Sequence, residues 1–93
     1  MKVLVTGSAG FIGFHLSLYL LKNNNTVIGI DNINDYYDVN LKKSRLKILK
    51  KNKNFIFHKF DLINAKKLED LIKTFKIKYI VHLAAQAGVR YSI

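Results

Sequence analysis

The chain has 93 residues, enough for one small domain, and it contains neither cysteine nor proline. Without cysteine, disulfide bonds, thiolate metal sites and cysteine nucleophiles are excluded. Sixteen Lys and Arg residues against six Asp and Glu residues give a net charge of +10. This charge indicates an acidic partner or lysines spread over solvated faces, and the scarcity of arginine argues against nucleic acid. No apolar run reaches the ~18 residues of a membrane span and no secretory signal opens the chain, so we expect a cytoplasmic protein with no membrane partner.

The first part of the chain predicts a strand, a glycine turn, a helix and a second strand. Residues 2–6 form a β-branched and apolar run that is typical of a buried strand. Glycines at positions 7, 10 and 13 follow, and an apolar stretch then runs to residue 21. The residues that recur there at helical spacing are Ile12, Leu16, Tyr19 and Leu20. Residues 26–30 predict the second strand, ending at Asp31, which completes a βαβ unit of about thirty residues.

A second helix and a third strand are expected next. Residues 32–37 are interpreted as a loop, in which Tyr36 and Tyr37 either cover a bound nucleotide or pack within the loop. Residues 38–51 predict a helix with a rough apolar stripe and many lysines, and Asp38 near its start suits the helix dipole. The apolar positions of this helix are Leu41, Leu46, Ile48 and Leu49. Residues 55–60 predict the third strand, which Asp61 follows.

The third helix has the most regular pattern. Its apolar residues lie at positions i, i+3, i+4 and i+7, and Asn64 is a suitable N-cap. These apolar residues are Leu68, Leu71, Ile72 and Phe75. Residues 78–83 predict a fourth strand, and a loop of small residues, 84–88, follows it.

The predicted fold class is α/β, a Rossmann-type doubly wound parallel sheet of four strands with three helices. Alternating strands and helices imply parallel pairing with right-handed crossovers. The strands are near-continuous apolar runs, as expected where helices cover both faces of a sheet. The expected strand order is 3-2-1-4, half of such a sheet, so we expect a truncated domain. The open edge of the fourth strand would then allow self-association or pairing with a complementing chain.

The glycine turn predicts a dinucleotide site. The first glycine, Gly7, permits a sharp turn, Gly10 lets the backbone approach a pyrophosphate, and Gly13 lets the helix pack closely against the strand. Phosphate oxygens would then meet N–H groups at the positive end of the helix dipole. The alternative is a purely structural turn. The spacing has one residue more before the second glycine than the G-x-G-x-x-G pattern.

Aspartates follow the second and third strands at the same edge of the predicted sheet. Asp31 is positioned to accept both ribose hydroxyls of adenosine, and its charge would repel a 2′-phosphate. Because neither Asn32 nor Ile33 offers a compensating positive charge, the sequence predicts NAD rather than NADP. Asp61 is a candidate acceptor for the adenine amino group, with Leu62 packing on the ring. Either aspartate also suits a local turn instead.

The histidines carry a weaker signal. His15 in the first helix and His82 in the fourth strand are interpreted as structural rather than catalytic residues. Because the three histidines have no ligand spacing, we predict no metal site.

Three segments carry a resemblance to a known family. Residues 6–13 (TGSAGFIG) resemble the nucleotide-binding turn of the extended short-chain dehydrogenase/reductase superfamily, whose pattern accounts for the glycine spacing. Residues 31–42 (DNINDYYDVNLK) and 82–92 (HLAAQAGVRYS) resemble, more narrowly, the nucleotide-sugar epimerases that act on UDP-glucuronate. The resemblance runs over essentially the whole chain and covers the first third or so of such an enzyme.

The resemblance implies the partial NAD-binding domain, residues 1–93, of a UDP-glucuronate 4-epimerase that serves capsule or other cell-surface polysaccharide synthesis. In that family a tightly held NAD takes hydride from C4 of the sugar and returns it to the opposite face, while protein groups orient the sugar and move protons. The implied ligands are therefore NAD and a UDP-sugar.

The resemblance also implies roles for individual residues. The cofactor-binding positions are Gly7, Gly10, Phe11, Ile12 and Gly13 at the pyrophosphate, Asp31 and Asn32 at the ribose, Asp61 and Leu62 at the adenine, and Leu83, Ala84 and Ala85 at the central portion. The substrate-binding positions are Gln86, Val89 and Arg90. A guanidinium suits a carboxylate or a phosphate, and the alternative for Arg90 is a surface arginine.

The family's catalytic base, the tyrosine of a Tyr-x-x-x-Lys pair, has no counterpart in this sequence. No tyrosine of the chain is followed four residues later by lysine. The lysine of the pair lowers the pKa of the tyrosine, and an isolated tyrosine with a pKa near ~10 is a poor base. We therefore expect no catalytic residue here, with the substrate lobe absent, and no epimerase activity of the chain alone. The alternatives to an epimerase fragment are a non-catalytic nucleotide-binding remnant or scaffold module, or a fragment of a related nucleotide-sugar dehydratase or 4-epimerase.

Overall fold

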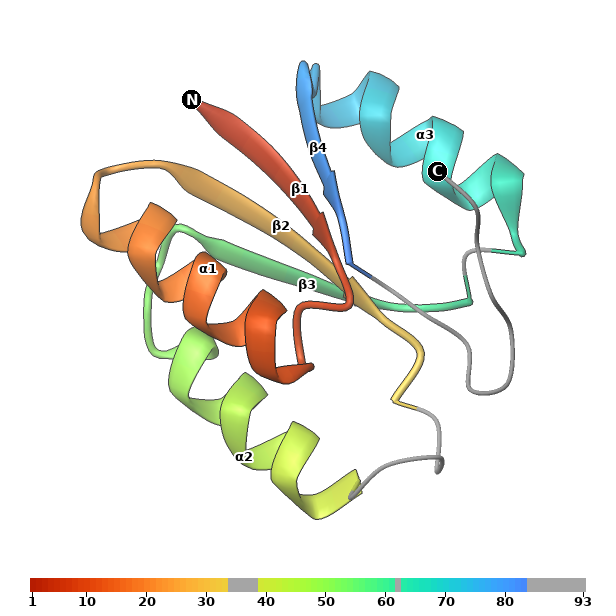
Figure 1. The fold of residues 1–93 in the computed structure, drawn as a ribbon. Helices are drawn as coiled ribbons and strands as arrows, with labels where there is room; N and C mark the ends of the chain where they lie inside the picture. Colours follow the sequence, from red (N-terminus) through yellow and green to blue (C-terminus); the bar gives the residue numbers. More distant parts are fainter. Residues whose placement is uncertain (34–38, 62, 84–93) are drawn as a thin grey trace.

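The computed structural model describes residues 1–33, 39–61 and 63–83. Strands and helices alternate along the chain (Figure 1). The elements are β1 (Lys2–Thr6), α1 (Phe11–Lys22), β2 (Thr26–Asp31), α2 (Val39–Lys50), β3 (Phe55–Lys59), α3 (Ala65–Phe75) and β4 (Tyr79–His82). Each element expected from the sequence is present within one residue of its predicted ends. None of the helices in the described ranges is long and apolar enough to cross a bilayer.

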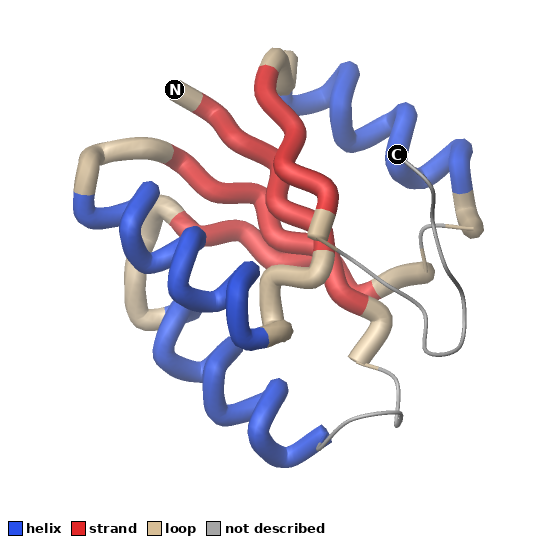
Figure 2. The backbone as a smooth tube through the Cα atoms, viewed as in Figure 1, coloured by secondary structure: helices blue, strands red, loops and turns tan. Residues whose placement is uncertain are grey.

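The four strands form one parallel sheet in the order β3-β2-β1-β4. Helices α1 and α2 cover one face of the sheet and α3 covers the other (Figures 1 and 2). The register pairs Thr6 with both Ile30 and His82, and it pairs Asp31 with Lys59. The carboxyl ends of the strands therefore meet at one edge of the sheet. The predicted fold class and strand order are confirmed.

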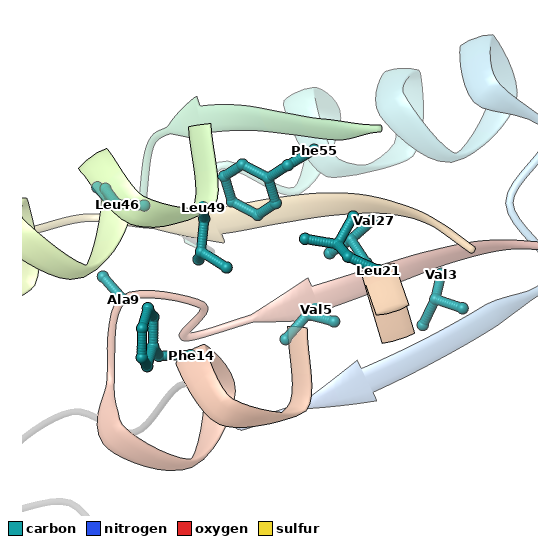
Figure 3. Close-up of a cluster of buried hydrophobic side chains, with 9 residues drawn as sticks. All are labelled: Val3, Val5, Ala9, Phe14, Leu21, Val27, Leu46, Leu49 and Phe55. Atoms are coloured by element: carbon teal, nitrogen blue, oxygen red, sulfur yellow. The ribbon is translucent and has the colours of Figure 1, made fainter. Parts of the chain in front are cut away.

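The apolar runs of the strands supply two cores, one on each face. Successive strand residues point to opposite faces, so Val3 and Val5 pack towards α1 and α2 while Leu4 packs towards α3. The core beneath α1 and α2 consists of Val3, Val5, Ala9, Phe14, Leu21, Val27, Leu46, Leu49 and Phe55 (Figure 3). The core beneath α3 consists of Leu4, Ile28, Ile30, Leu71 and Ile77. This two-sided burial explains why the strands do not alternate between apolar and polar residues.

The buried face of α1 differs from the one that hydrophobicity predicts. Ile12 and Tyr19, taken from the sequence as part of the helical stripe, are each 65% exposed, and Leu16 and Leu20 are only partly buried. The buried residues of α1 are Gly13, Phe14, Ser17 and Leu21. Two of these four are small, which lets the helix approach the sheet closely. Close approach therefore decides the buried face, and counting apolar side chains gave a wrong answer.

The buried residues of α3 agree with the sequence prediction, and those of α2 agree in part. In α2, Leu46 and Leu49 are buried, but Leu41 and Ile48 are each 48% exposed. In α3 the expected cap is confirmed, because the Asn64 side chain accepts a hydrogen bond from the backbone N–H of Lys67. The predicted apolar face of α3 is confirmed as well, with its four residues packed against the sheet.

Candidate functional site

The chain turns sharply between β1 and α1, at the carboxyl edge of the sheet. Gly7 has a φ of 71°, in the left-handed region that glycine adopts without steric cost. The N–H groups of Gly7 and Ser8 both donate to the carbonyl oxygen of Ile30, at 2.8 and 3.2 Å. The N–H of Gly10 donates to the Gly7 carbonyl at 3.0 Å, and α1 begins at the next residue. The turn is thereby fixed to the end of β2.

Gly13 is required for the helix to stand against this turn. A Cβ atom at position 13 would overlap the carbonyl oxygen of Gly7 and lie 2.8 Å from its carbonyl carbon. Both atoms belong to the backbone, so neither can move aside without changing the turn. A Cβ atom at Gly10 would lie 3.2 Å from the same oxygen, a tight but smaller conflict. The conformation of the turn therefore requires glycine at position 7 and its packing requires glycine at position 13, whereas the steric requirement at position 10 is weaker.

The first turn of α1 presents backbone N–H groups at the edge of the sheet. The first N–H of α1 that makes a helical hydrogen bond is that of Phe14, which donates to the Gly10 carbonyl at 2.9 Å. The N–H groups of Phe11, Ile12 and Gly13 have no carbonyl one turn earlier in the helix to bind. Among the described residues no side chain caps this end, and no acidic residue lies in the first turn. The helix end therefore keeps its partial positive charge for an external acceptor.

Asp31 lies directly against the turn, at the end of β2. Its Oδ2 accepts a hydrogen bond from the N–H of Ala9 at 3.1 Å. Its Oδ1 accepts one from the N–H of Ile33 at 2.9 Å and one from Lys42 Nζ at 3.2 Å. The Asp31 side chain is 3% exposed and the Lys42 side chain is 10% exposed. One buried carboxylate thus joins the turn, the end of β2 and helix α2.

Two cations of α2 belong to this site, and reasoning from the sequence missed both. Besides Lys42, Arg45 contributes Nη1, which donates to the carbonyl oxygen of Ala9 at 3.1 Å, and its guanidinium lies 5.8 Å from the centre of the Phe11 ring. The two residues after Asp31 carry no positive charge, and the compensating cations come instead from the lysine-rich helix α2. A signal was present, because Lys42 shares the i, i+4, i+7 spacing of the buried Leu46 and Leu49.

Asp61 follows β3 at the same edge, but it is exposed and forms a local turn. Its Oδ1 accepts a hydrogen bond from the N–H of Ile63 at 3.1 Å, and its carbonyl accepts one from the N–H of Asn64 at 2.9 Å. This is the turn-forming arrangement that the sequence left as an alternative. A contact between Asp61 and adenine stays a prediction.

The end of β4 is joined to the end of β1 beside the turn. The N–H of Leu83 donates to Thr6 Oγ1 at 2.9 Å and to the Thr6 carbonyl at 3.2 Å. The same hydroxyl lies 2.9 Å from Nδ1 of His82. Leu83 therefore lies at the carboxyl edge, next to the glycine turn. The predicted site residues Leu62, Ala84, Ala85, Gln86, Val89 and Arg90, and the Tyr36-Tyr37 pair, lie outside the described residues.

The remaining candidate from the sequence is a histidine of α1. His15 is exposed on α1, where its ring packs edge-on against Phe11 and Phe14 at 4.7 and 5.1 Å between ring centres. In the parts of the chain that the structure describes, no three carboxylate or imidazole groups gather in a way that could hold a metal ion.

The strand order, the glycine turn at the first β–α corner and the acid that ends β2 together define the first half of a Rossmann-type domain. Residues 4–93 match the family described as GDP-mannose 4,6 dehydratase, and the chain belongs to this family.

The chain is similar to nucleotide-sugar epimerases and to protein CapI. UDP-glucuronate 4-epimerase of Thermodesulfobacterium geofontis (strain OPF15) is 50% identical over 90 residues, which are 97% of this chain and 28% of the relative. Protein CapI of Staphylococcus aureus is 54% identical over 96 residues, covering 100% of this chain and 28% of the relative. The crystal structure of UDP-glucuronic acid 4-epimerase from Bacillus cereus in complex with UDP-glucuronic acid and NAD superposes with a TM-score of 0.85 at 43% identity, over 97% of this chain and 28% of that one. The predicted resemblance to such epimerases is confirmed, and the chain spans less than a third of their length.

The two glycines that contact the Gly7 carbonyl should differ in how far they tolerate a methyl group. We expect Gly13→Ala to lower the free energy of unfolding by about 3 kcal/mol, since the new Cβ overlaps backbone that cannot move aside. Gly10→Ala, with its Cβ at 3.2 Å, is the matched control and should cost about 1 kcal/mol or less. Urea unfolding followed by circular dichroism measures both. Equal losses would show that the helix does not depend on close approach at Gly13.

The buried ion pair should contribute more to stability than any neighbouring lysine. Lys42→Met leaves the buried Asp31 carboxylate with two N–H donors among the described residues and no cation at Oδ1, so we expect the free energy of unfolding to fall by about 2 kcal/mol. Lys43→Met, at the adjacent exposed position, should change it by less than about 0.5 kcal/mol. Chemical denaturation of both variants checks this, and a loss no greater at position 42 than at 43 would contradict the pairing.

Proposed function

We propose that this chain forms the cofactor-binding half of an NAD-dependent nucleotide-sugar epimerase of the UDP-glucuronate 4-epimerase kind. The observation that carries the proposal is the Asp31 carboxylate, held against the glycine turn by the N–H of Ala9 at 3.1 Å. It sits at the carboxyl end of β2, next to the α1 N-terminus, where doubly wound folds bind dinucleotides. Identities of 50% and 54% to the epimerase and CapI, over 97% and 100% of the chain, support the same conclusion.

The residues present fit a dinucleotide diphosphate. The uncapped N–H groups at the start of α1 are donors for phosphate oxygens, and Gly7, Gly10 and Gly13 keep the approach to them free of side chains. Lys42 and Arg45 add two positive charges close to the turn. Phe11 and Ile12, which are 66% and 65% exposed, are proposed to contact the ligand beside these groups.

The Asp31 carboxylate fits a ribose with two free hydroxyls. A hydroxyl donates a hydrogen bond to a carboxylate oxygen, whereas a 2′-phosphate brings like charge to it. Lys42 offsets part of that charge, so the preference for NAD over NADP rests on Asp31 and not on a lack of cations. Asn32, Asp61 and Leu62 are proposed around the adenosine, and Leu83, Ala84 and Ala85 along the central portion. Bound NAD would supply the hydride acceptor for the reaction.

The substrate side of the proposal rests on relatives and not on described geometry. Gln86, Val89 and Arg90 are proposed to face a UDP-sugar, and a role in cell-surface polysaccharide synthesis in the cytoplasm is proposed from the likeness to epimerases and to CapI.

The outer edge of β4, where Tyr79 and Ile80 are 53% and 51% exposed, is proposed to pair with a further strand, from another chain or a second copy.

A second candidate is the corresponding half of a nucleotide-sugar 4,6-dehydratase. The description of the matching family, GDP-mannose 4,6 dehydratase, favours it. The proposed contacts to NAD are common to both candidates, and only residues on the substrate side separate them.

Exchange of the Asp31 carboxylate for an amide tests the cofactor assignment. We expect calorimetric titration of the 93-residue chain to show NAD binding that is tighter than NADP binding. Asp31→Asn should weaken NAD binding by about tenfold or more, because charged hydrogen bonds to two hydroxyls are lost. It should also strengthen NADP binding, because Lys42 and Arg45 remain without the opposing charge. Glu69→Gln removes the same charge at an exposed position on α3 and should change neither affinity.

Two results would sink the cofactor assignment. The first is no NAD binding to the wild-type chain at saturating concentration. The second is equal loss of NAD affinity in Asp31→Asn and Glu69→Gln, since only the first of these carboxylates lies at the turn.

We further propose that the chain alone does not turn over UDP-glucuronate. Its sequence has no Tyr-x-x-x-Lys pair, so no tyrosine has the lysine that would lower its pKa and make it a base. Incubation of the chain with NAD and UDP-glucuronate, followed by chromatography of the nucleotide sugars, should yield no epimer. Any turnover above that of a boiled sample would contradict this.

A further inference from the structure

A groove of about 600 Å³ runs between α2 and β3, on the sheet face that α2 covers. Its apolar lining comes from Ile33, Leu46 and Phe57. Its remaining lining consists of Lys43, Lys47, Lys50, Lys51 and Lys59. Two of these eight residues adjoin the Asp31 site, since the N–H of Ile33 donates to Asp31 and Lys59 is level with Asp31 in the sheet. Lys42 and Arg45, the cations that contact the site, do not line the groove, so the groove is a neighbouring feature with its own set of cations.

No carboxylate among the described residues balances the charge of the groove. Residues 39–60 contain eight Lys and Arg residues and no Asp or Glu. Among the described residues, none of the five groove lysines is within ion-pair distance of a carboxylate. Lys50 instead holds its ammonium 5.3 Å from the centre of the Phe57 ring. Five ammonium groups around one apolar floor create a positive potential that an anionic ligand would lower.

The spacing of the lysines fits an extended chain. Lys43, Lys47 and Lys50 lie on successive turns of α2, and each turn advances about 5.4 Å. An extended peptide places every second side chain on the same face at intervals of about 6.6 Å. Alternate carboxylates of such a peptide can therefore meet successive lysines, while its other side chains face the apolar floor.

The sheet edge beside the groove also suits an extended peptide. β3 is the last strand on its side of the sheet, and Phe57 and Lys59 in it line the groove. In doubly wound sheets the strand in this position stays at the edge when further strands are added next to β4. An edge strand offers backbone N–H and C=O groups to an incoming strand.

We propose that the groove between α2 and β3 is a docking site for an acidic, extended segment of a partner protein, in which carboxylate and apolar side chains alternate. A second copy of this chain is a poor occupant, because it carries a net charge of +10. Its few acids are also engaged in part, since Asp31 is buried against Lys42 and Glu69 pairs with Lys73. Single-stranded nucleic acid fits less well, because Phe57 is the only aromatic residue among the described residues that line the groove, and it already stacks on Phe55.

Synthetic peptides test the proposal with the unmodified chain. The probe is a fluorescently labelled peptide, Glu-Val-Glu-Val-Glu-Val-Glu, titrated with the 93-residue chain and followed by anisotropy. We expect it to bind about tenfold more tightly than Glu-Gly-Glu-Gly-Glu-Gly-Glu, which has the charge without the apolar side chains. The corresponding peptide with lysine in place of glutamate should not bind. Equal affinity for the valine and glycine peptides, or binding of the lysine peptide, would overturn the proposal.

Charge reversal locates the binding. Lys47→Glu/Lys50→Glu should weaken binding of the valine peptide by about tenfold or more. The control Lys22→Glu/Lys66→Glu makes the same change of net charge at exposed positions on α1 and α3 and should weaken it less than about threefold. Equal losses in the two double variants would show attraction to net charge only and overturn the proposal. Tighter binding of a twelve-residue oligothymidylate that competes with the peptide would overturn it in favour of nucleic acid.

Folding and the cofactor site are controlled separately. Both double variants should keep the circular dichroism of the wild-type chain, and the comparison of peptides needs no variant. Failure of NAD to bind would leave the peptide result unchanged, so this proposal and the proposed function fail independently.

Discussion

A single buried carboxylate holds together the part of the molecule where its function is proposed. Asp31 accepts hydrogen bonds from the N–H of Ala9 in the turn and from the N–H of Ile33, and it pairs with Lys42 of α2 at 3.2 Å. Burial of a carboxylate is unfavourable unless donors replace its water. The turn, the end of β2 and helix α2 must therefore be in place together. The same two oxygen atoms contact all three, in addition to the backbone hydrogen bonds and the apolar core that hold the turn and α2.

The same two oxygen atoms are the proposed acceptors for the ribose. The Asp31 side chain is 3% exposed, and a ligand hydroxyl that binds Oδ1 would have to share this atom with Lys42 or displace that ammonium. Under the proposed function, binding of a ligand hydroxyl to Asp31 therefore weakens the ion pair between Asp31 and Lys42. Ligand recognition at Asp31 and the attachment of α2 are linked in this way. The link is local, because Lys42 touches the site and the groove lysines further along α2 do not.

The sequence was sufficient for the fold because its signals are local. Strand runs, the glycine turn and the Asn64 cap each depend on a few neighbouring residues, and all of them agree on one topology. What failed depends on tertiary distance. The buried face of α1 is set by the approach of Gly13 to the Gly7 carbonyl, which a count of apolar residues does not register. Lys42 was missed because it is one of many lysines in α2. Its spacing from Leu46 and Leu49 indicates burial, but its pairing with Asp31, eleven positions earlier, is seen only in the structure.

The in-register pairing of the strands has a consequence for how this scaffold can vary. Thr6 is level with Ile30 and His82, and Asp31 is level with Lys59, so the connecting segments all leave the sheet from one line of backbone atoms. That line is held by main-chain hydrogen bonds and by two apolar cores. Outside the glycine turn and the contacts of Asp31, which are tied to the frame, insertions or exchanges in the connecting segments can therefore alter which molecules are recognised without disturbing the frame that presents them.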